Sequence, residues 1–186
     1  MLNSLVGIIA SSGGAAAGGA SYESIASATG TGSSSTISFS SIPSTYTSLQ
    51  IRGIALSPTD YIQLRVNGDS GTNYTRHQLV ATGSSVAAGG TTATDSYRFA
   101  NLGSGGEQNT TYPNVFVVDL HDYTSTTRYK TFRGFSGNDT NSLGTVNLTS
   151  SLWLNTNAIS SITISNINAN NFTTNTQIAL YGIKGA

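Results

Sequence analysis

From about Ser21 onward, the chain alternates apolar and polar residues with a period of two. Within residues 49–56, for example, Leu49 and Ile51 fall on one side and Gln50 falls on the other. This alternation is the signature of a β-strand with one buried face. No segment of eleven residues shows a convincing helical period of 3.6, so the pattern predicts an all-β protein.

The alternation predicts nine or ten short strands separated by turns. They cover residues 36–40, 49–56, 61–67, 74–80, 97–99 (a short strand), 114–120, 128–135, 145–154, 160–165 and 176–183. Many short strands at this spacing are typical of an antiparallel β-sandwich of jelly-roll or Greek-key type. We therefore expect one sandwich domain over residues 21–186.

Turn and loop signals lie between these strands. Asn67-Gly68 is the strongest short hairpin signal, so residues 74–80 are predicted to pair with residues 61–67. Residues 81–94 and 101–111 are rich in Gly, Ser, Thr and Ala and are predicted to be loops. A further loop is expected over residues 166–176, with the aromatic ring of Phe172 as an apolar plug.

Residues 1–20 differ from the rest and are expected to form an extended N-terminal arm. The first ten residues are mildly apolar, and the next ten contain only Ser, Gly and Ala. A signal peptide needs a basic start, whereas the first basic residue here is Arg52. The better interpretations are a docking arm on a flexible tether, or a segment that packs on its own domain. The residues predicted to anchor the arm in a partner are Leu2, Leu5, Val6, Ile8 and Ile9.

The composition narrows the function classes. The chain of 186 residues has 8 basic and 8 acidic residues, and its 9% charged content is far below the ~25% of an ordinary domain. Few and unclustered basic residues disfavour nucleic-acid binding, and no apolar run is long enough to span a membrane. The absence of Cys excludes disulfides and thiol catalysis. A net charge of zero suits dense self-assembly, because neighbouring copies do not repel one another.

Candidate chemistry is sparse. His77 and His121 are far apart in the sequence and have no metal-ligand spacing. The segment Gly134-Phe135-Ser136-Gly137 is one residue short of a nucleophile elbow, and most carboxylates fall in apparent turns. We therefore expect no catalytic residue, no metal and no cofactor. Trp153 lies between two leucines in the sequence and is expected in the core or at an interface. The Tyr residues are spread along the chain, and Tyr often lies at subunit interfaces because its ring has a polar tip.

Several segments of the chain are distinctive: residues 37–55 (ISFSSIPSTYTSLQIRGIA), 67–69 with Asn73-Tyr74 and His77, 122–126 before Lys130-Thr131, 179–183 and 3–7. These segments resemble small virion-associated proteins of tailed bacteriophages, especially aquatic and cyanobacterial ones. The resemblance implies a non-enzymatic β-sandwich on the particle exterior, commonly trimeric, with no catalytic residues.

Three functions follow from this resemblance and from the residues. The first is a head decoration (cement) protein that contacts copies of itself and the major capsid protein and stabilises the head. The alternative is a tail-fibre or receptor-binding module that recognises host-surface polysaccharide. Fibre shafts usually carry repeats, and none is present here, which favours the first. An enzyme is the third and least favoured.

Overall fold

The computed structural model describes residues 21–57, 61–101, 111–140 and 143–185, and these ranges contain twelve strands and no helix. The strands are β1 (Tyr22–Thr29), β2 (Thr36–Phe39), β3 (Ser48–Ala55), β4 (Tyr61–Val66), β5 (Tyr74–Thr82), β6 (Val86–Thr94), β7 (Tyr97–Asn101), β8 (Asn114–His121), β9 (Lys130–Asp139), β10 (Gly144–Trp153), β11 (Ile162–Asn166) and β12 (Gln177–Ile183).

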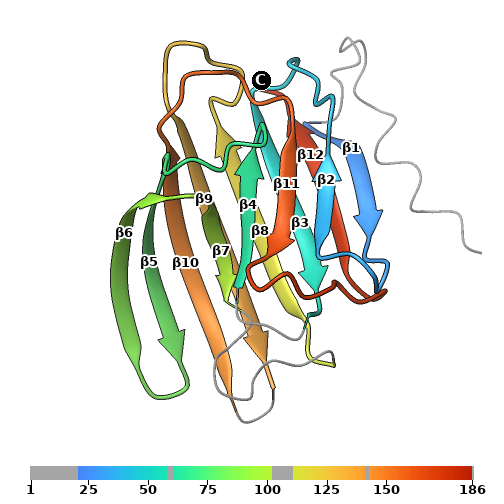
Figure 1. Cartoon of the computed structure of the whole chain (residues 1–186), viewed down its shortest axis with the longest axis vertical. Helices are drawn as coiled ribbons and strands as arrows, with labels where there is room; N and C mark the ends of the chain where they lie inside the picture. Colours follow the sequence, from blue (N-terminus) through green and yellow to red (C-terminus); the bar gives the residue numbers. More distant parts are fainter. Residues whose placement is uncertain (1–20, 58–60, 102–110, 141–142, 186) are drawn as a thin grey trace, which may run out of the picture.

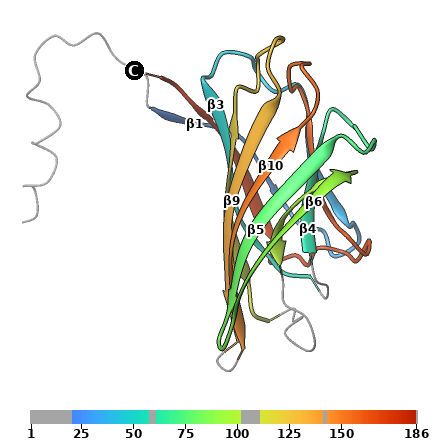
Figure 2. The same ribbon diagram turned by 90° about the vertical axis from the view of Figure 1, so that its left-hand side faces the viewer.

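The strands form two antiparallel sheets that pack face to face, which confirms the predicted β-sandwich. The larger sheet has eight strands in the order β1-β12-β3-β8-β9-β10-β5-β6, and the smaller has four in the order β2-β11-β4-β7. Figure 1 shows the smaller sheet in front of the larger one, with β5 and β6 extending beyond it. Figure 2 shows the larger sheet from its side, as one curved layer.

Strands from the beginning of the chain pair with strands from its end. β12 lies between β1 and β3, β11 lies between β2 and β4, and β10 pairs with β5. Such nested, long-range pairing is characteristic of Greek-key and jelly-roll sandwiches. The two chain ends of the sandwich are therefore fixed side by side.

The core fills the space between the sheets. Inward-facing side chains alternate with outward-facing ones along each strand, so that Leu49 and Ile51 of β3 have no exposed surface. Trp153 is 1% exposed, which places it in the core. Phe172 is fully buried, and its backbone bonds Ser34 and Gly32, so it closes one end of the core as predicted.

The predicted hairpin between residues 61–67 and 74–80 is wrong. β4 lies in the smaller sheet and β5 in the larger one, so the Asn67-Gly68 turn is a corner between the two layers. The side-chain Oδ1 of Asn67 accepts hydrogen bonds from the backbone N–H groups of Ser160 and Ser161. These contacts hold the turn against the β11 side of the sandwich instead of closing a hairpin.

The carboxylate of Asp69 fixes the rest of this corner. It accepts hydrogen bonds from the indole Nε1 of Trp153 at 2.7 Å, from the Asn73 amide at 2.9 Å and from the Gly71 backbone N–H at 2.8 Å. Burial alone would raise the pKa of the Asp69 carboxyl, but these three hydrogen bonds hold the pKa below its ordinary value. The corner is thereby tied to the largest aromatic ring of the core.

Two strands were not anticipated. Residues 81–94 were expected to be a loop, yet residues 86–94 form β6, which pairs with β5 at the edge of the larger sheet. Residues 22–29 form β1 at the opposite edge, with an irregularity between Ser24 and Ala26. Both have weak local strand signals, and an existing strand edge supplies the hydrogen bonds that order them.

Other expectations concern residues that the structure does not describe. The arm, residues 1–20, lies outside the described residues, and so do its anchoring residues Leu2, Leu5, Val6, Ile8 and Ile9. Most of the loop predicted over residues 101–111 also lies outside them. The arm stays a prediction.

We expect Asp69→Asn to lower the free energy of unfolding at pH 7 by about 1–3 kcal/mol, because a buried hydrogen-bond donor loses its charged acceptor. The native-state pKa of Asp69 is lowered, so its contribution is present above the pKa of the unfolded chain and is lost as pH falls through the native value. Urea unfolding between pH 7 and pH ~2.5 should show a smaller loss of stability in the variant than in the wild type.

Asp122→Asn is the matched control, because Asp122 forms an exposed ion pair with Arg128. This substitution should lower the free energy of unfolding by less than ~1 kcal/mol. Equal stability of Asp69→Asn and wild type at pH 7 would contradict the role of this corner.

Candidate functional site

The two histidines do not form a metal site together. Both lie on the outer face of the larger sheet, but β9 and β10 separate the β5 strand of His77 from the β8 strand of His121. Three strand spacings amount to ~14 Å. His121 Nε2 instead lies 2.9 Å from the Arg133 guanidinium. Within the described ranges, no three His, Asp or Glu side chains gather as metal ligands.

The near-elbow at residues 134–137 is an ordinary stretch of strand. It lies in the middle of β9, where Ser136 is 1% exposed and its hydroxyl donates to the Phe99 carbonyl at 3.2 Å. A nucleophile elbow instead places its Ser on an exposed turn between a strand and a helix. Ser136 therefore has the environment of a structural residue of the core.

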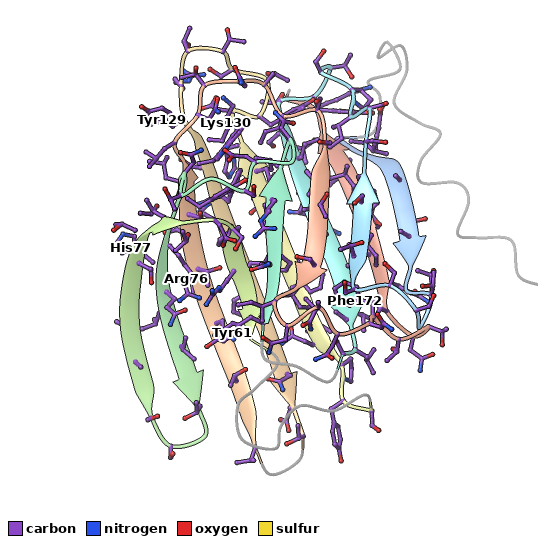
Figure 3. The ribbon with its side chains drawn as sticks, viewed as in Figure 1. Tyr61, Arg76, His77, Tyr129, Lys130 and Phe172 are labelled. Atoms are coloured by element: carbon purple, nitrogen blue, oxygen red, sulfur yellow. The ribbon has the colours of Figure 1, made fainter. Side chains whose placement is uncertain are left out.

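A buried lysine also serves the fold. Lys130 has no exposed surface, and its Nζ donates to the backbone carbonyls of Ser125 (2.7 Å), Arg128 (2.8 Å) and Thr156 (3.0 Å). Desolvation lowers the pKa of its ammonium group. Its three N–H groups donate to three carbonyls, so Lys130 holds two loops together. Figure 3 labels Lys130 at one end of the sandwich.

The unusual surface of this protein is the outer face of its larger sheet. Seven large apolar side chains project from it, with exposed fractions between 42% and 70%. We call this set the apolar face: Ile54, Leu79, Val86, Val115, Phe135, Val146 and Leu148. An antiparallel sheet with one face to water normally carries polar residues there, so the apolar face departs from the usual pattern.

Strand register makes the apolar face continuous. Phe135 on β9 lies opposite Leu148 on β10, which in turn lies opposite Leu79 on β5. In the neighbouring row, Ile54 on β3 lies opposite Val115 on β8. Side chains directly opposite one another have Cβ atoms about 5 Å apart and touch. Strands distant in the sequence thus contribute to one patch on the order of several hundred Å², the size at which exposed apolar surface marks an interaction site.

A polar row borders the apolar face. Gln50 on β3 donates a 2.7 Å hydrogen bond to Asp119 on β8, and Arg52 donates to the Gln50 side-chain oxygen. The Arg52 guanidinium also lies 5.1 Å and 5.4 Å from the ring centres of Tyr22 and Tyr181. An apolar centre with an ordered polar margin is the usual anatomy of a protein interface.

A shallow hollow of about 760 Å³ lies at the β1 side of the apolar face. Small residues of the paired strands β1 and β12, such as Ser27 and Ala179, contribute to it. Larger side chains, including Arg52, Ile54 and Phe135, also line the hollow. The hollow is a depression in an exposed sheet face and is large enough for a peptide segment or a sugar.

Comparisons with models of protein families, with curated proteins and with solved structures found no match for this chain. In the part of the chain that the structure describes, no helix is long and apolar enough to cross a membrane. The interpretation of the apolar face therefore depends on its own geometry.

The sequence prediction placed the binding residues in the arm, residues 1–20, and missed the apolar face. A signal was present in the strand predicted over residues 114–120 (NVFVVDL), whose consecutive apolar residues cannot all point inward. Val115 points outward and is 50% exposed, whereas Phe116 points inward and is 4% exposed.

Substitutions of two phenylalanines of β9 test which face of the larger sheet stabilises the fold. Phe132 is fully buried, so Phe132→Ala should cost ~3–5 kcal/mol of unfolding free energy. Phe135 is 57% exposed on the opposite face, so Phe135→Thr should change stability by less than ~1 kcal/mol. Urea unfolding of dilute protein measures both, and a large loss in Phe135→Thr would mean that the apolar face supports the monomer itself.

Proposed function

We propose that this protein is a non-enzymatic structural component on the exterior of a bacteriophage particle, specifically a head decoration (cement) protein. The observation that carries the proposal is the apolar face, a continuous exposed patch on a sandwich with very few charges. A patch of this kind marks an interaction site, and a protein partner is one that would cover it. The resemblance of residues 37–55 and the other phrases to virion-associated proteins supports the same conclusion.

We infer that other copies of this chain cover the apolar face, in the trimer typical of such proteins. Seven side chains, each about half exposed, approach the ~800 Å² that each partner contributes to a standard interface. Burying each exposed half contributes about 1 kcal/mol, enough to matter against the entropy lost on association. The net charge of zero adds no repulsion between identical copies.

Residues 1–20 would then attach the assembly to the shell of the particle. The chain enters the sandwich at Ser21, beside Lys184 at the edge of the larger sheet. Ten residues of Ser, Gly and Ala separate this point from the apolar segment, and they span up to ~33 Å when extended. The side chains of Leu2, Leu5, Val6, Ile8 and Ile9 could therefore reach a capsid subunit beneath the sandwich.

The alternative, a tail-fibre module that binds host-surface polysaccharide, has one observation in its favour. The Arg52 guanidinium approaches the rings of both Tyr22 and Tyr181, and Arg52 and Tyr181 line the hollow. Aromatic rings beside hydrogen-bonding side chains suit a sugar. The copy number in the particle separates the two functions: hundreds of copies indicate the head, and a few tens or fewer indicate the tail.

We expect Leu148→Glu to convert the wild-type oligomer into a folded monomer, because a carboxylate in the centre of an apolar interface cannot be desolvated cheaply. Leu154→Glu is the matched control, since Leu154 is also exposed, at 41%, but lies outside the apolar face. Light scattering after size exclusion measures the mass. A wild-type monomer at all accessible concentrations would overturn the self-association.

We expect deletion of residues 1–20 to abolish attachment to heads while the sandwich stays folded and oligomeric. Co-sedimentation with heads that lack the protein measures attachment, and circular dichroism checks the fold. Undiminished head binding by the shortened chain would eliminate the arm as the attachment element.

A further inference from the structure

Two arginines meet at the open side of the sandwich, away from the apolar face. β5 extends past β7, the edge strand of the smaller sheet, so the inner side of β5 faces that edge. Arg76 of β5 and Arg98 of β7 both approach the ring of Tyr61, at 6.0 Å and 5.9 Å from its centre. Figure 3 shows Arg76 and Tyr61 at this side of the molecule. Two of the chain's six arginines thus share one aromatic ring.

Neither arginine has a carboxylate partner in the described part of the chain. Its ion pairs join Arg65 to Asp95, Arg128 to Asp122 and Lys184 to Glu23. The pKa of Arg76 is lowered, first by desolvation and then by the positive charge of Arg98. A like charge beside a half-buried guanidinium is unfavourable unless an anion completes the group.

A small cavity of about 70 Å³ lies between the two arginines. Arg76, Arg98, Thr91, Thr94 and Ser96 line it. The Thr94 hydroxyl is within hydrogen-bond distance of the Tyr74 and Ser96 carbonyls, and the Ser96 hydroxyl donates to Gln63 at 2.8 Å. The two guanidinium groups and the Thr91 hydroxyl therefore supply the donors that a ligand could use.

The carboxylate of Asp95, which precedes the cavity-lining Ser96 in the chain, already has its own partners. Asp95 pairs with Arg65 through one oxygen, and its other oxygen lies 3.0 Å from the Ser96 hydroxyl. Desolvation would raise the pKa of Asp95, but Ser96 and Arg65 hold it below its ordinary value, so Asp95 is ionised at neutral pH. Counting Arg65, Arg76, Arg98 and Asp95, the cluster keeps a net charge of +2.

We propose that this cavity binds a compact oxyanion, a single carboxylate or phosphate group, between the guanidinium groups of Arg76 and Arg98. A guanidinium presents paired N–H donors that match both kinds of group. The cavity has the volume of one such group and cannot hold a larger ligand whole. The anion would neutralise the repulsion between the arginines and join β5 to β7, and so the two sheets. This site is independent of the proposed virion function.

The test is thermal unfolding of the full chain in sodium phosphate or sodium acetate, against sodium chloride at equal ionic strength. For the wild type, the midpoint should rise by about 5–10 °C when the bound anion reaches one hundred times its Kd. Arg98→Gln should abolish the rise and, in chloride, unfold at a temperature no lower than wild type, because it removes the repulsion. Arg133→Gln, which removes a charge from the other face, should keep the rise.

A titration observed by NMR of the arginine Nε–H groups gives a second readout that does not depend on variants. The Arg76 and Arg98 signals of the wild type should shift and saturate, and the other four arginines should not. Saturation by phosphate alone assigns a phosphate site, and saturation by acetate assigns a carboxylate site. The proposal is overturned if neither anion saturates these signals, or if all three proteins gain the same stability.

Discussion

The packing of the two unequal sheets against each other is the interaction on which the rest of this structure depends. Four strands cover the inner face of an eight-stranded sheet except where β5 and β6 extend beyond them, and the side chains between the sheets form one continuous core around Trp153, Phe132 and Tyr97. Because side chains alternate along a strand, packing of the inner face dictates what every strand presents on its other side. Two ionisable groups in this frame have internal partners: Lys130 donates to three carbonyls, and Asp69 accepts from Trp153.

The composition of the outer side of the larger sheet therefore depends on how strands from the whole chain are arranged. Five strands, far apart in the sequence, place Ile54, Val115, Phe135, Leu148 and Leu79 side by side in water. A monomer gains nothing from such a surface, whereas a subunit in a dense assembly does. The scarce charges on this sheet face, such as Arg52 and Asp119, lie in the polar row at the border of the patch, whereas Arg76 and Arg98 meet away from it. The apolar face and the arginine pair are thus two chemically different surfaces of one molecule.

Much of the fold follows from local pattern. The alternation around Leu49 and Leu64 predicts strands close to the observed β3 and β4, and Phe172 has the burial expected of it. The hairpin prediction failed because Asn67-Gly68 reports only that the chain turns, whereas contacts with Ser160 and Ser161 decide into which sheet it continues. β6 was missed because its sequence, with Gly and Ala among its Thr residues, has only a weak strand signal, and pairing with β5 supplies its order.

The candidate site was less accessible to sequence reasoning. Val115 and Phe116 are equally apolar neighbours, and nothing in the chain alone says which of them faces water. The sequence by itself determined an all-β chain with a charge-poor surface and no residue pattern for chemistry, because period and composition are local quantities. Only the tertiary structure decided that the outward residues of β3, β8, β9, β10 and β5 form one apolar face and that two arginines share one ring. Both depend on strand register and sheet order, which set the distances between residues remote in the chain.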